Sequence, residues 1–70
     1  MSSIVKVIEV IAQSEKSFDD AVESALTETA KSVDGIKEIW VSSMKAIVDN
    51  NRIVEYRVTA KVSFVVKGHS

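Results

Sequence analysis

The chain's only tryptophan, Trp40, lies among alternating polar and apolar residues and is the side chain best suited to hold a flat molecule. Its indole ring can stack on a planar aromatic ligand. Two other interpretations stay open. The ring packs at a subunit interface, as large aromatic side chains often do, or it is exposed and Lys61 lies across it in a cation–π contact.

Two basic residues, Arg57 and Lys61, are candidates for holding an anionic group. Guanidinium and ammonium groups both bind phosphate, and arginine does so through two parallel hydrogen bonds. The alternative for Arg57 is a salt bridge to Glu38 or Glu55. A polar face that carries these two basic groups beside Trp40 therefore indicates ligand binding rather than catalysis.

Metal binding and catalysis have weaker support. Residues 49–51 (Asp-Asn-Asn) could offer oxygen ligands to calcium, but a plain turn explains the same residues. Asp19, Asp20 and Glu23 could do likewise, but carboxylates in a first helical turn already complement the helix dipole. The chain has no cysteine, and the single histidine, His69, lies near the C-terminus. We therefore expect no metal site and no enzyme activity.

The size and charge of the chain limit which classes of protein it can belong to. Seventy residues form a single domain, 1–70, and a chain of this length is marginal alone unless it is cross-linked or oligomeric. The formal net charge of −1, with both signs interspersed, does not indicate nucleic-acid binding. No apolar run is long enough to span a membrane and no signal peptide is evident, so a cytoplasmic protein is expected.

Hydrophobic periodicity predicts one helix, over residues 17–33. Ser17 suits the N-cap position, Asp19 and Asp20 follow in the first turn, and Gly35 is expected to end the helix. The predicted buried stripe recurs at three- and four-residue steps: Phe18, Val22, Ala25, Leu26, Thr29, Ala30 and Val33.

Three strands are predicted around this helix. Residues 4–12 are almost continuously apolar, which is typical of a strand buried on both sides or facing a partner subunit. Residues 36–48 and 54–66 form two more strands, joined by a turn at residues 49–52. Residues 67–70 are expected to fray.

The order β-α-β-β predicts an α+β fold in which a three-stranded antiparallel sheet wraps on one helix, with the third strand between the other two. A symmetric turn places Trp40 opposite Lys61 and Met44 opposite Arg57. The predicted inner face comprises Ile39, Val41, Ile47, Val54, Val58, Ala60 and Val62. The predicted outer face comprises Glu38, Trp40, Ser42, Met44, Arg57, Thr59, Lys61 and Ser63.

Element lengths predict self-association. A helix of about 16 residues spans roughly 24 Å, whereas strands of about 13 residues span roughly 43 Å. The strand pair must therefore extend beyond its helix, and long uncovered edge strands are an aggregation hazard. A closed, symmetric homo-oligomer is the usual solution.

The chain resembles the dodecin family over residues 4–66. The segments that carry the resemblance are VKVIEVIAQS (5–14), SFDDAVESAL (17–26), VDGI (33–36) and EYRVTAKVSF (55–64). It implies a hollow homododecamer with the helix outside and the sheet facing the interior. It also implies a non-enzymatic flavin-binding and storage protein, with FMN or riboflavin as the cofactor; some members also bind coenzyme A.

Three positions depart from the family pattern. Flavin-binding dodecins carry Trp-x-Glu in their second strand, whose Trp stacks on the flavin, and a Gln after the Tyr of their third strand. Here Glu38 takes the stacking position, Trp40 the Glu position and Arg57 the Gln position. These three are the candidate cofactor-binding residues. The alternative is a flavin-poor assembly with a structural, calcium-binding or coenzyme A-binding role, since one dodecin-like subgroup with Arg at this position is calcium-binding.

Overall fold

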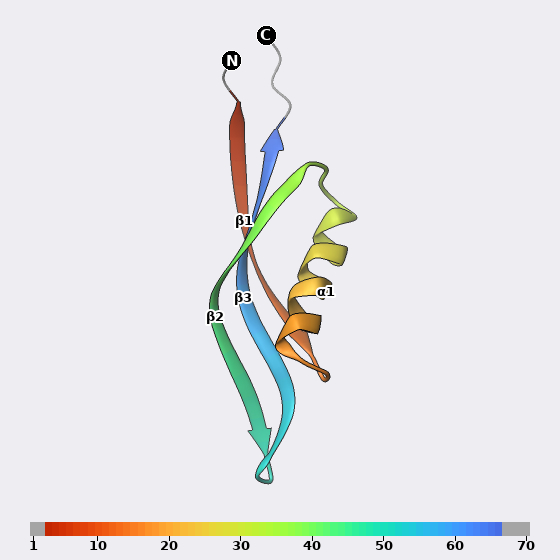
Figure 1. Ribbon diagram of the computed structural model, residues 1–70, viewed down its shortest axis with the longest axis vertical. Helices are drawn as coiled ribbons and strands as arrows, with labels where there is room; N and C mark the ends of the chain where they lie inside the picture. Colours follow the sequence, from red (N-terminus) through yellow and green to blue (C-terminus); the bar gives the residue numbers. More distant parts are fainter. Residues whose placement is uncertain (1–2, 67–70) are drawn as a thin grey trace.

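A computed structural model of the chain describes residues 3–66 and confirms the predicted element order (Figure 1). The strands β1 (Ile4–Ser14), β2 (Ile36–Asp49) and β3 (Arg52–Val66) accompany one helix, α1 (Phe18–Ala30). The predicted C-terminal tail, with His69, lies outside the described residues.

The three strands form one antiparallel sheet in the order β1-β3-β2, so the last strand lies in the centre as predicted. Because β3 pairs with both other strands, β1 and β2 are the two edges of the sheet. The molecule is long and thin, 57 × 20 × 13 Å. Figure 1 shows α1 lying along the middle of the sheet, with strands continuing past both ends of the helix.

The start of α1 follows the sequence prediction. The Ser17 hydroxyl accepts a hydrogen bond from the Asp20 amide at 2.9 Å, which is the N-cap contact. The buried Ser14 hydroxyl, at the end of β1, donates to the Asp20 carboxylate at 2.6 Å. It also accepts from the Lys16 amide at 2.9 Å. This hydroxyl therefore joins the end of β1 to the first turn of the helix.

The end of α1 differs from the prediction. The helix stops at Ala30, three residues before the predicted end. The amides of Ser32 and Val33 both bond the Thr29 carbonyl, at 3.0 and 3.1 Å, and this tight turn ends the helix. Gly35 therefore does not cap the helix. It has φ +75° and its carbonyl accepts from the Val65 amide at 3.1 Å, so it directs the chain onto the sheet.

The core of the single chain is small. Ala21 and Ala25 of α1 and Val58, Ala60 and Val62 of β3 are its buried apolar residues within the described range. Alanines on both surfaces let the helix approach the sheet closely. Phe18 and Tyr56 close one end of this core with an edge-to-face contact at 5.0 Å between ring centroids.

The buried stripe of α1 is rotated from the predicted one. Ala25 and Thr29 are buried as predicted, but Ala21 replaces Leu26, which is 40% exposed, and Ala30 is also exposed. The cause is tertiary: α1 packs on β1 and β3 far more than on β2. The helix side that faces β2 is therefore left open.

The turn between β2 and β3 is the predicted one, because Asn50 and Asn51 have φ of 54° and 61°, as a type I′ turn requires. The register beyond it contains irregularities. One lies between Ile47 and Val48 and another between Val41 and Ser43, and between them β2 is displaced by one residue.

This displacement overturns part of the predicted pairing. Met44 lies opposite Val58, not Arg57, and therefore shares the inner face. Arg57 lies opposite Lys45. Ile47 lies opposite Glu55, so Ile47 leaves the inner face on which it was predicted. Trp40 is past the second irregularity and lies opposite Lys61, as predicted.

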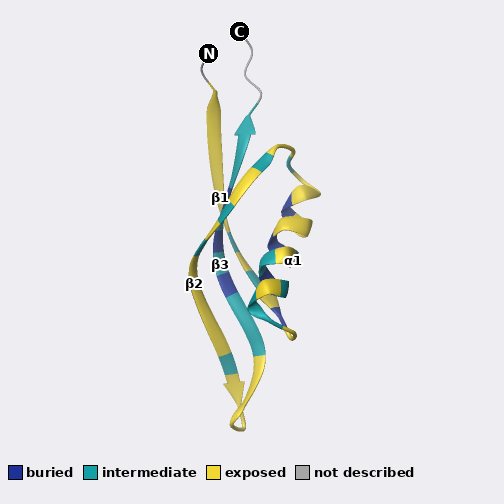
Figure 2. Cartoon of the chain, viewed as in Figure 1, coloured by how far each residue is buried: buried dark blue, intermediate teal, exposed yellow. Residues whose placement is uncertain are grey.

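Much apolar surface is left uncovered by the chain itself (Figure 2). β1 is an edge strand whose Ile4, Val5, Val7 and Ile11 are all more than half exposed, so the chain does not bury it on both sides. Val48, Ile53 and Val54 are exposed at the far end of the β2–β3 hairpin, beyond the helix; Val54 was predicted to face it. The predicted overhang is therefore present.

Candidate functional site

The outer face of the sheet, opposite the helix, carries an open cleft of about 610 Å³. Two successive cross-strand rows build it, because residues opposite one another in an antiparallel sheet point to the same side. Glu9, Lys61 and Trp40 form one row across β1, β3 and β2, and Val7, Ser63 and Glu38 form the next. Hereafter the term outer cleft refers to these six residues.

Trp40 dominates the outer cleft. Its side chain is 61% exposed, and the Lys61 ammonium lies 4.8 Å from the centre of its ring. The predicted cation–π contact therefore forms within the chain. The exposed part of the Trp40 ring remains available for packing, either against a ligand or against another subunit.

Two carboxylates stand beside this ring. Glu9 and Glu38 are both exposed, and among residues 3–66 neither takes part in an ion pair or a side-chain hydrogen bond. Glu9 lies directly opposite Lys61, and Glu38 lies next to the same row. With one lysine and two glutamates, the outer cleft has a formal charge of −1.

Of the three candidate cofactor-binding residues, only two lie in the outer cleft. Glu38 and Trp40 line the same cleft. Arg57 does not: it lies four residues from Lys61 along β3, about 13 Å at the usual strand rise. Its guanidinium donates to Gln13 and Glu55, each at 3.1 Å. The predicted alternative of an Arg57–Glu55 salt bridge is confirmed.

Sequence reasoning missed the contribution of β1. Val7 and Glu9 reach the outer cleft because odd-numbered residues of β1 pair with odd-numbered residues of β3. The near-continuous apolar character of β1 hid this alternation. Glu9, the one charged residue between Val7 and Ile11, was the available signal that this side of the strand faces outward.

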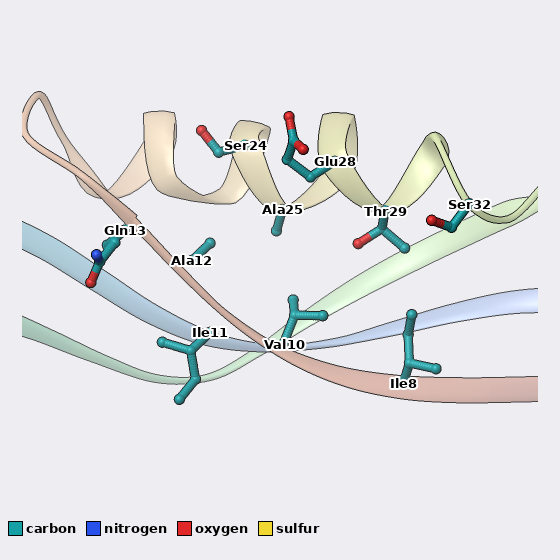
Figure 3. A pocket seen from close by; sticks show the side chains of 10 residues that line it. All are labelled: Ile8, Val10, Ile11, Ala12, Gln13, Ser24, Ala25, Glu28, Thr29 and Ser32. Carbon is teal, nitrogen blue, oxygen red and sulfur yellow. The ribbon is translucent and has the colours of Figure 1, made fainter.

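A second hollow, of about 440 Å³, lies between β1 and α1. Val10 and Ala12 point toward Ala25 of the helix, whereas Ile11 points to the other side of the sheet (Figure 3). Glu28 is at its rim but pairs with Lys31 at 2.8 Å. This groove has an aliphatic floor and therefore suits packing rather than recognition of a polar ligand.

The structure gives no support to metal binding at the two acidic segments, residues 49–51 and the first turns of α1. Within residues 3–66, no three histidine, cysteine, aspartate or glutamate side chains gather closely enough to hold a metal ion. Residues 49–51 form the hairpin turn, and Asp20 bonds Ser14. The helix of the described range is neither long nor apolar enough to cross a membrane.

Comparisons with known proteins agree with the fold. A family model described as Dodecin matches residues 4–67. A calcium dodecin of Mycobacterium tuberculosis, described as a calcium-chelating antigen with a novel calcium-binding site, is 31% identical over 97% of each chain, with TM-score 0.81. Among curated protein sequences, none matches significantly.

Two further solved structures have the same fold at lower identity. An arginine-to-alanine variant of the Thermus thermophilus dodecin is 20% identical over 97% of this chain and 100% of its own, with TM-score 0.91. The dodecin of Streptomyces davaonensis is 16% identical over 97% and 100%, with TM-score 0.90.

Proposed function

We propose that this chain, which belongs to the dodecin family, is a non-enzymatic protein that binds and stores a flat aromatic small molecule. Flavin, as riboflavin or FMN, is the first ligand to test. Trp40, 61% exposed above a cleft that also holds charged side chains, is the observation that carries this proposal. Stacking on such a ring supplies about 0.5–1.5 kcal/mol beyond area burial.

Glu38 and Trp40 are the proposed ligand contacts within one chain, and Lys61 is a neighbour that the ligand must displace or accommodate. Arg57 can join this site only when a second copy brings its own Arg57 to the cleft. None of the six outer-cleft residues is a cysteine or a histidine, so Ser63 has no cleft histidine to activate it, which supports a binding role.

We extend the proposal to a closed assembly of twelve copies in the cytoplasm. The uncovered apolar residues of β1 and of the distal hairpin support self-association, since surface of this extent is rarely left exposed in a monomer. A chain without cysteine fits a reducing compartment. Each copy would then present its outer cleft to its neighbours.

Riboflavin and FMN titrated with the purified protein test the ligand. We expect their fluorescence to be quenched on binding at micromolar protein. Trp40→Leu should weaken binding by roughly 2- to 10-fold, the equivalent of about 0.5–1.5 kcal/mol. Met44→Leu is the matched control, because Met44 is similarly exposed but lies on the opposite face. Absence of quenching would contradict flavin binding.

A calcium-binding, coenzyme A-binding or purely structural assembly is the second candidate. The 31% identity to the calcium-chelating relative favours calcium among these. Such a site would draw carboxylates from more than one copy. It predicts a melting temperature that rises with added calcium and does not respond to flavin. Indifference to calcium, flavin and coenzyme A would leave the structural role.

A further inference from the structure

We propose that the outer cleft selects planar aromatic cations over neutral or anionic ring systems. This inference rests on the proposed function and names the ligand class for the same site. It follows from three features of the described residues: an exposed indole ring, two carboxylates without partners, and a lysine that already occupies the ring.

The ring itself attracts positive charge. The face of an indole carries a negative quadrupole, and the Lys61 ammonium lies 4.8 Å from its centre. Lys61 therefore acts as an internal stand-in for a ligand cation. A planar cation would replace this contact and add stacking area that an ammonium group cannot provide.

The charged side chains around the ring also favour a cationic ligand. Glu9 and Glu38 outnumber Lys61, so a cation entering the outer cleft meets a net charge of −1. At about 6 Å in water, one such charge changes affinity by roughly threefold, and an anionic phosphate is disfavoured by a larger factor. A cation beside Glu38 also offsets the cost of removing water from this carboxylate, which a neutral or anionic ring does not do.

Proflavine, riboflavin and FMN are suitable probes, since they are three-ring planar systems that are cationic, neutral and anionic at pH 7. Equilibrium dialysis against the full-length protein measures all three in the same way. We expect proflavine to bind about threefold more tightly than riboflavin, and riboflavin more tightly than FMN. Raising the salt from about 20 to 200 mM should weaken proflavine binding and leave riboflavin unchanged.

Two substitutions locate the effect. Glu38→Gln should lower proflavine affinity about threefold and leave riboflavin unaffected. Lys61→Met frees the ring and removes the only positive charge of the cleft, so proflavine affinity should rise about 2- to 5-fold or more. Glu15→Gln is the matched control, because it removes one exposed carboxylate outside the cleft and should change neither affinity.

The outcomes separate the inference from the function beneath it. Riboflavin binding as tightly as proflavine, with Glu38→Gln silent, overturns the charge preference and leaves the ring-binding function standing. An equal loss in Glu15→Gln and Glu38→Gln shows diffuse attraction and overturns the site. Failure of all three probes to bind overturns the proposed function itself. If a variant does not fold, the salt series on the unmodified protein still decides the charge preference, because proflavine binding that does not respond to salt overturns it.

Discussion

Replacing Ser14 with alanine removes the hydroxyl that joins the end of β1 to the start of α1. Ser14 is 8% exposed, and its hydroxyl donates to the Asp20 carboxylate at 2.6 Å and accepts hydrogen bonds from the Lys16 amide at 2.9 Å and the Ser17 amide at 3.4 Å. A hydrogen bond to a charged group contributes about 1.5–3 kcal/mol net. The two amide contacts are longer and involve no charged group, and they add less than about 1 kcal/mol.

We therefore expect Ser14→Ala to lower the free energy of unfolding by about 2–3 kcal/mol per chain. For a domain of this size, that corresponds to a fall of roughly 10–20 °C in melting temperature. Thermal unfolding followed by circular dichroism measures it. Wild type and variant must be compared at one protein concentration, because association makes the melting temperature depend on concentration.

A matched control and a double-mutant cycle make the test decisive. Ser32→Ala removes the same hydroxyl from an exposed position that makes no side-chain hydrogen bond in the described part of the chain, so it should cost little. Combining Ser14→Ala with Asp20→Ala should show a coupling energy above about 1 kcal/mol. A loss no larger than that of Ser32→Ala, or no coupling to Asp20, would refute the linking role of Ser14.

Three further predictions concern assembly, ligand and fold. Sedimentation velocity should report a particle near twelve times the 7.7 kDa chain mass, and a stable monomer would contradict the argument from uncovered apolar surface. Glu38→Trp combined with Arg57→Gln places the residue types expected for flavin binding at two of the three departing positions and should tighten riboflavin binding in a fluorescence titration; unchanged affinity would mean that the cleft also differs in shape. Gly35→Ala should lower stability by about 1–3 kcal/mol in thermal unfolding, because φ is +75° and the new Cβ would lie 3.3 Å from the Val65 carbonyl oxygen. A loss below about 0.5 kcal/mol would show that the turn can relax.

Local patterns in the sequence determined the elements and their order. The Ser17 cap, the Asn50-Asn51 turn and the alternation in residues 54–66 are each decided by a few neighbouring residues. The two-residue turn fixes the register of β2 and β3 near it. The central position of β3 followed from the element order, because β3 runs antiparallel to both other strands and can pair with each of them. The Trp40–Lys61 contact also followed, because both residues lie where the register agrees with the symmetric pairing.

Tertiary packing decided the features that no short window of sequence contains. The register irregularities sent Met44 to the inner face, and nothing in the run of residues around Ser43 announces an extra residue. The buried stripe of the helix is rotated toward Ala21 because α1 packs on β1 and β3 more than on β2. Val7 and Glu9 joined the outer cleft only through the pairing of β1 with β3, which lie about fifty residues apart in the chain. Periodicity therefore specified each strand, whereas contacts between distant strands specified which side chains meet.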